Sequence, residues 1–558
     1  MTSLRNLIPA LGWLRNYQKD WLRADVTAGL TAAAVVIPMA MAYPVIAGLP
    51  LQVGLYTAFV PMVIYALLGT SRPLSVSTTT PIAILVGAGL RDLMPGSGTG
   101  DLIAGAAALA LLAGVMLVVA GVLRFGFIAN FISEPVLIGF KGAIALVITV
   151  DQLPKLLGFH ITKAGFFRNI LSVIEHVPET SLVTLAVAVA VFVLLFGLER
   201  FVPRAPAQLV AIAGAIAASS LLGLAQAGVA TVGAVPAGLP AFTRPAWDLC
   251  AALWPAAAGI ALMSFTEGIA AARAFRGPGE PPLVPNQELL AVGLANVGAG
   301  LFNGMPAGGG TSQTTVNSRA GARTQVAALV TALMALATLL LLAPVIALMP
   351  QAALAAVVVA SSAKLFKPAE FREIRRTRRT EFRWAVVAVL GVLLLGTLKG
   401  IIVAVIVSLL ALAYDAYNPP VYAVGRKRGT NIFRPLSAEH PDDETWPGLL
   451  IVRTEGRVFF ANAQVAGDKI WALIEEARPK VLIIDGRGII DIEYTALKML
   501  TEAEEKLRSE GIALWLVGLN PEVLAIVQNS KLGPVLGRDR LIANLETAVA
   551  QFLKTPRG

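Results

Sequence analysis

Long apolar segments alternate with short polar ones along most of the chain. A membrane-spanning helix needs about 20 apolar residues in succession, so each long segment predicts one span. In the first half, the segments lie near residues 26–47, 51–68, 71–90, 102–123, 133–150, 182–198 and 208–224. In the second half, they lie near 251–272, 287–301, 311–322, 326–342, 344–360, 384–398 and 401–416. The pattern therefore predicts 14 spans in two groups of seven.

The third segment of each group is interrupted by polar residues. The segment 71–90 begins with SRPLSVSTTT, and the later one has three glycines that favour a break, followed by Thr311 and Ser312, which can cap a helix. Irregular backbone at membrane depth is tolerated only where it is buried in protein or lines a cavity. A helix that starts there points its free N–H groups and positive dipole end at the space before it. We therefore expect two broken helices with an anion site at their N-termini, near Thr79 and Thr311.

A soluble phosphate-binding loop is the alternative interpretation of the glycine-rich stretch. It is disfavoured because GAGLFNG (298–304) lacks the G-x-G-x-x-G spacing and no Gly-Lys-Ser/Thr follows. Seven is an odd number, so the two groups of spans must have opposite orientations, as in an inverted repeat. The repeats cover about 24–226 and 250–418 of a transmembrane domain at 24–418.

The loop charges predict the orientation. Arginines between the spans, and the basic run 364–383, fall on the side that holds residues 1–23. Cytoplasmic loops collect Lys and Arg, so we expect a multi-pass protein of the cell membrane with both termini in the cytoplasm. The same basic run is suited to contact with anionic lipid.

The composition changes after residue 418. Residues 419–447 are interpreted as a polar linker, and residues 448–558 as a soluble domain in which strands alternate with helices. The sequence GLLIVRTEGRVFF (448–460) is typical of a hairpin of two strands. We therefore expect a small cytoplasmic α/β domain after the membrane domain.

Composition narrows the function classes. The chain is 56% hydrophobic and 14% charged, whereas soluble domains have about 25% charged residues. The net charge of +10 is explained by basic residues at span ends, so no nucleic-acid partner is expected. The single cysteine excludes an internal disulfide, and three scattered histidines offer no metal-ligand spacing. We expect neither a metal nor a cofactor, and no enzymatic activity.

Several motifs together resemble those of the sulfate permease family of anion transporters. They are IPMAMAYPVIAGLPLQVGLYTAFVPMVIYALLGTSRPLSVS (37–77) and NSRAGARTQ (317–325), and residues 448–553 resemble a STAS domain. The resemblance implies a core domain that carries substrate against a gate domain, and a homodimer. It also implies secondary transport, by alternating access, of an inorganic or small organic anion of the sulfate, bicarbonate or dicarboxylate class.

By position, the resemblance implies a substrate site between the first, third, eighth and tenth spans. The first-span pattern Pro-Gln-x-x-Ala-aromatic is PMAMAY (38–43) here, and the tenth-span pattern Gly-Phe-Ser-Arg is GTSQ (310–313). The implied site residues are Met39, Tyr43, Thr79, Thr80, Gly310, Thr311, Ser312 and Gln313. Gln313 stands where an arginine is usual, and Met39 where a glutamine is usual. A neutral amide donates weaker hydrogen bonds than a guanidinium, so we expect weaker anion binding or a preference for organic anions.

Glu267 lies in the eighth span, within SFTEGIA (264–270), where the resemblance implies an acid linked to proton or sodium coupling. A carboxylate inside a span is costly and usually functional, so we expect proton-coupled symport through Glu267. Sodium coupling, or an uncoupled channel or exchanger, is the alternative. A structural alternative makes Glu267 the partner of Lys141 in the fifth span, although Lys141 can also extend to the cytoplasmic interface.

The C-terminal domain lacks the switch serine of anti-sigma-factor antagonists. Tyr494 stands at that position, within DGRGI…IEYTA (485–496), and no phosphate loop is present. We therefore expect a folding, dimerisation and regulatory module, and treat a membrane sensor that signals through this domain as the least favoured alternative.

Overall fold

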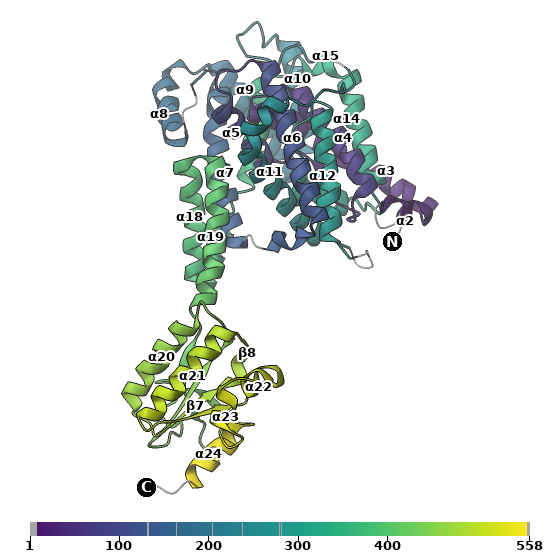
Figure 1. Cartoon of the computed structure of the whole chain (residues 1–558). Coiled ribbons are helices and arrows are strands. Elements are labelled where there is room, and N and C mark those ends of the chain that lie inside the picture. The colour runs from purple at the N-terminus through teal and green to yellow at the C-terminus, as the bar shows by residue number, and fades with distance from the viewer. Residues whose placement is uncertain are drawn as a thin grey trace. The chain divides into compact units, whose positions relative to one another are not determined.

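The computed structural model describes residues 8–130, 133–162, 165–203, 205–236, 238–277, 280 and 282–554. Residues 1–7 of the expected N-terminal segment and residues 555–558 of the expected C-terminal domain lie outside these ranges. The chain forms two compact units, Met1–Leu409 and Leu410–Gly558. Figure 1 shows the chain and labels many of the elements of both units.

Unit 1 contains a helix for each predicted span. The first seven are α3 (Lys19–Ala47), α4 (Leu51–Leu68), α5 (Thr80–Leu93), α6 (Thr99–Val122), α7 (Glu134–Leu157), α9 (Leu182–Phe201) and α10 (Ala207–Leu222). The second seven are α11 (Trp247–Ala274), α12 (Pro285–Leu301), α13 (Thr311–Arg319), α14 (Val326–Leu341), α16 (Gln351–Ala363), α18 (Arg379–Leu395) and α19 (Thr397–Tyr417), which continues into unit 2. Unit 1 also contains the shorter helices α2 (Ala10–Arg15), α8 (Phe166–His176), α15 (Ala343–Ile346) and α17 (Pro368–Thr377).

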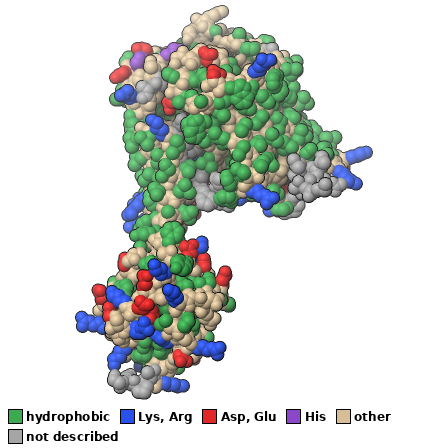
Figure 2. All heavy atoms as spheres, in the orientation of Figure 1, with side chains coloured by type: hydrophobic (Ala, Val, Ile, Leu, Met, Phe, Trp, Pro, Cys, Tyr) green, Lys and Arg blue, Asp and Glu red, His purple; other side chains and the backbone are tan. Residues whose placement is uncertain are grey.

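The two groups of seven and the broken third element of each confirm the predicted fold class. Within the described ranges, seven helices are long and apolar enough to cross a membrane, and further apolar helices are shorter. Figure 2 shows hydrophobic side chains covering most of the visible face of unit 1, while charged side chains are spread over unit 2. Exposed residues such as Leu182, Leu221 and Leu341 belong to this apolar surface. A surface of that kind is suited to lipid rather than to water.

The helices of unit 1 pack in two sets. The first helix set comprises α3–α6 and α11–α14, and the second comprises α7–α10 and α16–α18. Glycines allow close packing within the first set, between α6 and α12. A Cβ atom on Gly114 would lie 2.7 Å from the Gly293 carbonyl oxygen, and one on Gly293 would lie 2.9 Å from the Gly114 carbonyl oxygen. Such small-residue contacts are typical of helices packed in membranes.

Unit 2 is a six-stranded sheet with helices on both faces. Its strand order is β10-β9-β7-β5-β3-β4, with β10, β9, β7 and β5 parallel and β3 and β4 antiparallel to their neighbours. The strands are β3 (Val421–Arg426), β4 (Phe433–Pro435), β5 (Leu449–Thr454), β7 (Val481–Asp485), β9 (Ala513–Val517) and β10 (Leu541–Ile542). The helices are α20 (Ala463–Ala477), α21 (Tyr494–Ser509), α22 (Pro521–Gln528), α23 (Leu532–Leu536) and α24 (Leu545–Lys554).

Side chains that alternate along the strands form two cores, one on each face of this sheet. Leu450 and Val452 pack on one face, and Leu449 and Ile451 on the other. A pleated strand points successive side chains to opposite faces, so both faces of β5 are covered.

Two local expectations for this region differ from the structure. Residues 421–426 and 433–435, within the expected linker, form β3 and β4 and extend the sheet. The predicted hairpin at 448–460 is wrong, because β5 pairs with β7 and β3, while β6 (Gly456–Val458) pairs in parallel with β8 (Ile489–Ile492). Gly456 has a φ of 95°, which turns the chain out of the main sheet between β5 and β6.

Candidate functional site

Two short strands bring the broken elements of the repeats together. β1 (Val76–Ser77) pairs antiparallel with β2 (Gly308–Gly309), and the Gly310 N–H donates to the Ser75 carbonyl at 3.1 Å. α5 begins at Thr80, shortly after β1, and α13 begins at Thr311, shortly after β2. Because the strands are antiparallel, the two helices leave the pair in opposite directions with their N-termini close together.

The glycines of β2 are required by close packing. A Cβ atom on Gly308 would lie 3.1 Å from the Ser264 Cα atom, and one on Gly309 would lie 2.6 Å from the Gly268 Cα atom. Neither glycine is among the described residues with positive φ. The expectation that these glycines favour a break is therefore met through contact with α11 rather than through a special backbone conformation.

Polar side chains of α11 and α12 satisfy the irregular backbone before α13. Asn296 exchanges two hydrogen bonds of 2.9 Å with the backbone of Ala307, and Ser264 donates to the Ala307 carbonyl at 2.5 Å. Thr78 donates to the Pro306 carbonyl at 3.0 Å. Sequence reasoning missed Asn296, although a polar amide inside an apolar span is the signal that points to it.

The N-cap residues of the two helices at the site make no capping hydrogen bond with their side chains. Thr79 and Gly310 immediately precede α5 and α13, and within the described chain neither helix has a side-chain cap on its first turn. The expectation that Thr311 or Ser312 caps α13 is therefore wrong. The Thr311 and Ser312 side chains are exposed instead, whereas Thr80 is buried. The first N–H groups of α13 are therefore open to an anion, whereas the start of α5 is buried and includes Pro81, which has no N–H.

The other predicted site residues are buried around these N-termini. Met39 and Tyr43 lie on α3, and the Tyr43 hydroxyl interacts with the Thr80 side chain. Gln313 is only 2% exposed; its Oε1 accepts a hydrogen bond from Ser77 at 2.8 Å, and its Nε2 lies 3.5 Å from the Thr78 carbonyl oxygen. The Gln313 amide therefore ties α13 to the segment before α5.

Glu267 on α11 lies beside the N-terminus of α5. Its Oε2 accepts a hydrogen bond from the Thr79 hydroxyl at 2.8 Å, and its Oε1 lies 3.5 Å from the Lys141 Nζ. The exposed fractions of the two side chains are 7% for Glu267 and 21% for Lys141. Lys141 thus forms an ion pair with Glu267, as the structural alternative predicted.

Two further buried carboxylates in unit 1, Asp25 and Glu288, accept hydrogen bonds from neutral N–H and O–H groups. Asp25 accepts hydrogen bonds from the backbone of Arg323 and Thr324, and so holds the chain just before α14. Glu288 accepts from the Tyr65 hydroxyl at 2.7 Å and from the Thr70 backbone and hydroxyl at 2.7 and 2.6 Å. Asp25 thus links α3 to residues 323 and 324 of the polar motif 317–325, and Glu288 links α12 to the end of α4.

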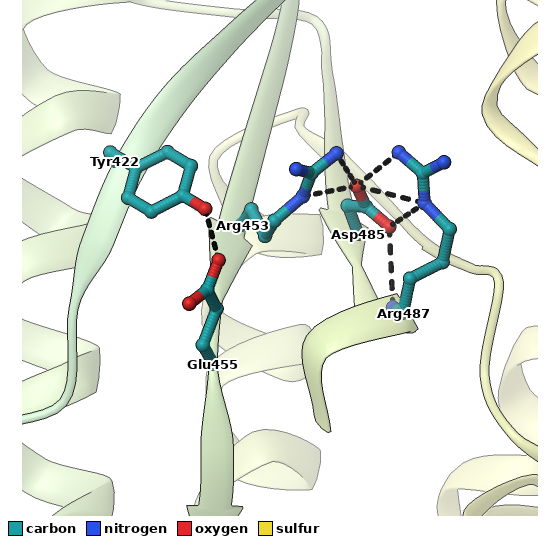
Figure 3. A network of polar contacts seen from close by, with 5 residues as sticks. All are labelled: Tyr422, Arg453, Glu455, Asp485 and Arg487. Atoms are coloured by element: carbon teal, nitrogen blue, oxygen red, sulfur yellow. Dashed lines mark hydrogen bonds and ion pairs between the residues drawn. The ribbon is translucent and has the colours of Figure 1, made fainter. Parts of the chain in front are cut away.

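Unit 2 has a separate network of charges (Figure 3), in which the fully buried Asp485 at the end of β7 lies between two arginines. The Arg453 Nε donates to Oδ2 at 2.7 Å, and the Arg487 Nη2 donates to the same oxygen at 2.9 Å. Burial raises the pKa of Asp485, but the hydrogen bonds from Arg487 and Arg453 outweigh it and lower the pKa below its usual value. Tyr494, at the position of the switch serine, is 81% exposed at the start of α21.

Comparison with known proteins agrees with the motifs, the broken helices and the C-terminal sheet. Residues 22–388 match the Sulfate permease family, and residues 440–548 match the STAS domain. The chain belongs to the sulfate permease family. A probable sulfate transporter of Mycobacterium tuberculosis is 33% identical over 98% of both chains. The chloroplastic sulfate transporter 4.1 of Arabidopsis thaliana is 28% identical over 98% of this chain and 83% of its own length.

Solved structures share the fold of this sulfate permease family member. The murine Slc26a9 anion transporter in its inward-facing state has a TM-score of 0.89 at 22% identity, covering 99% of this chain and 95% of that one. The transmembrane domain of the cyanobacterium bicarbonate transporter BicA has a TM-score of 0.60 at 24% identity, covering 69% of this chain and 98% of that one. These likenesses establish a multi-pass membrane region of the anion-transporter fold followed by a STAS domain.

Proposed function

We propose that the chain is a secondary active transporter that moves a small anion of the sulfate, bicarbonate or dicarboxylate class. The observation that carries the proposal is the β1–β2 pair, which brings the N-termini of α5 and α13 together. An anion bound there meets free N–H groups and positive dipole ends from both repeats. The substrates in the names of the relatives, sulfate for the proteins similar in sequence and bicarbonate for one similar in fold, belong to this class.

Hydroxyl groups are the main contacts that we propose for the anion. Gly310 permits close approach of the anion to the backbone, Met39 lines the site, and Gln313 positions α13 through Ser77. The proposed donors of hydrogen bonds are Tyr43, Thr79, Thr80, Thr311 and Ser312. Neutral donors and helix dipoles bind an oxyanion without requiring a full charge from α13.

Alternating access is supported by the different exposure of the two half-helices. The start of α13 is exposed at Thr311 and Ser312, whereas the whole segment from Thr78 through the first turns of α5 is buried. One helix N-terminus is therefore open and the other is covered in this conformation. We propose that the first helix set moves against the second to expose the site on the other side of the membrane.

Proton symport is the proposed mode of coupling. A proton on Glu267 removes a negative charge from beside the bound anion, so proton and anion strengthen each other's binding, and linkage makes the effect reciprocal. Sodium is the second candidate, because Glu267 and backbone carbonyls are hard oxygen ligands. The Thr266 hydroxyl donates to the Leu262 carbonyl at 2.7 Å within α11, so its oxygen remains able to accept a cation.

The remaining parts of the proposal concern assembly. We propose a homodimer with both termini in the cytoplasm and with the STAS domain as a regulatory module. Uptake by proteoliposomes tests the central function: labelled sulfate, bicarbonate and succinate are offered separately under an imposed proton gradient or sodium gradient. Accumulation of at least one anion that depends on the proton gradient is expected. Accumulation that follows only the sodium gradient would select the alternative, and no uptake of any anion would contradict the proposal.

A further inference from the structure

The Glu267 carboxylate lies where a substrate anion at α5 is expected to bind. One of its oxygens accepts a hydrogen bond from Thr79, the residue immediately before α5, and the other faces the Lys141 ammonium group. A hydroxyl donor, a helix N-terminus and a cation are the groups that recognise a carboxylate, sulfate or bicarbonate. In the described conformation, Glu267 therefore fills an anion site made partly by Lys141.

Lys141 supplies a charge that the proposed site otherwise lacks. The residues proposed to contact the anion are all neutral, and the Gln313 amide is engaged with Ser77. The Lys141–Glu267 separation of 3.5 Å is longer than the 2.7–2.9 Å of a strong charge-assisted hydrogen bond. Lys141 is also more exposed than Glu267, so its ammonium group has room for a second acceptor.

The ion pair also joins the two helix sets. Lys141 lies on α7, which packs against α9, α16 and α18, whereas Glu267 lies on α11, which packs against α5, α6 and α12. A movement of one set against the other changes the distance between the two side chains. Breaking a largely buried ion pair without a replacement partner is costly, so an anion that takes the place of the carboxylate makes the movement easier.

We propose that Lys141 is a substrate-binding residue, and that the anion contacts its ammonium group by displacing the Glu267 carboxylate. Glu267 and the substrate compete for one cation, and the substrate thereby opens a contact between the helix sets. This inference rests on the proposed transport function and adds to it the cationic residue and the competing group. Only non-covalent contacts change, and no bond is made or broken.

A double-mutant cycle tests the competition. Binding of sulfate and of succinate to the full-length protein is measured by isothermal titration for the wild type, Glu267→Gln, Lys141→Met, Lys141→Arg and the double variant Lys141→Met/Glu267→Gln. Removing the competing charge in Glu267→Gln should tighten binding about tenfold, on the scale of one charge-assisted hydrogen bond. Lys141→Met should weaken binding to a similar extent, and Lys141→Arg should retain it.

The decisive comparison is between Glu267→Gln and the double variant, because neither leaves an unpaired buried carboxylate. The tighter anion binding of Glu267→Gln should be completely absent in the double variant. Equal affinity of these two proteins would show that Lys141 is only a structural counter-ion and would overturn the inference. Lys364→Met/Glu199→Gln is the matched control, since it removes an exposed lysine–glutamate pair of 2.5 Å and should leave binding unchanged. Absence of binding by the wild type would overturn the proposed function as well, whereas binding that does not depend on Lys141 overturns this inference alone.

Discussion

Glu267 in unit 1 and Asp485 in unit 2 are both buried carboxylates, but their partners differ in number, distance and origin. Asp485 has two arginines at 2.7 and 2.9 Å, one on β5 and one in the turn directly after β7. Glu267 has one hydroxyl at 2.8 Å and one lysine at 3.5 Å, and that lysine belongs to the other helix set. The short, doubled contacts of Asp485 are suited to fixing the fold, whereas Glu267 has a single, longer ion pair with a lysine of the other helix set.

The largest expected effect, on anion uptake, comes from placing a carboxylate at the exposed N-terminus of α13. Ser312→Glu puts a negative charge on the exposed first turn of α13, where it occupies the proposed anion site. Repulsion between two unit charges at 4 Å is about 4 kcal/mol in surroundings of intermediate dielectric constant, so uptake should fall by more than about 100-fold. Initial rates of labelled anion uptake by proteoliposomes provide the measurement.

Ser318→Glu is the control for this prediction, because it makes the same change near the other end of the same helix. Both variants should elute as folded protein in size-exclusion chromatography, and only Ser312→Glu should lose uptake. Normal uptake by Ser312→Glu would show that the anion does not bind at the N-terminus of α13.

Asp485→Asn should produce the next largest effect, on stability alone. The change leaves Arg453, whose side chain is only 16% exposed, without its charged partner. Loss of one member of a buried ion pair typically costs about 3 kcal/mol or more. Hydrogen–deuterium exchange of the β5 and β7 amides in the full-length protein measures the local free energy of opening.

Asp491→Asn is the matched control, since Asp491 pairs with Arg457 but is 38% exposed. Exposed pairs contribute about 1 kcal/mol at most, so this control should hardly change the exchange rates. Similar effects of the two changes would contradict a structural role specific to Asp485.

Acid should weaken the wild-type C-terminal unit through the same carboxylate. The folded pKa of Asp485 lies below its unfolded value, which is about 3.9 for a free aspartate. The stabilisation is therefore complete above the unfolded pKa and is lost as the pH falls through the folded pKa. Thermal unfolding between pH 3 and pH 7 should show a loss of stability at the acidic end that is smaller in Asp485→Asn. An identical acid dependence in both proteins would assign the loss to other groups.

The smallest effect is expected from Ser77→Ala, which removes the 2.8 Å hydrogen bond from Ser77 to Gln313. A neutral hydrogen bond contributes about 1 kcal/mol, so the melting temperature should fall slightly and uptake should fall only a few-fold. Ser318→Ala, on the same helix but outside this contact, is the comparison. Loss of uptake as complete as that of Ser312→Glu would mean that Ser77 itself contacts the anion.

The broken helices were predictable from the sequence because local signals specify them. Apolar segments of sufficient length predict spans, and polar, glycine-rich interruptions at equivalent places predict the site. The sequence could not decide whether Lys141 pairs with Glu267, because α7 and α11 are far apart in the chain and only the packing of the helices sets the distance between the two side chains. The same holds for Asn296, whose role depends on the backbone of Ala307. The strands β3 and β4 were missed because each is short and the segment that contains them is mostly polar and proline-containing. Their pairing depends on distant neighbours, since β3 pairs with β5 and β4 pairs with β3.

Gradient-driven accumulation by Glu267→Gln tests the contrast between the two carboxylates most directly. Glutamine mimics the protonated acid and keeps the size of the side chain. Proteoliposomes that contain the wild type or Glu267→Gln receive an inward proton gradient, and both the accumulation of labelled anion and its exchange against internal anion are measured. Glu267→Gln should still exchange the anion but no longer accumulate it, whereas the wild type should do both. Undiminished accumulation by Glu267→Gln would show that Glu267, like Asp485, is only a structural carboxylate.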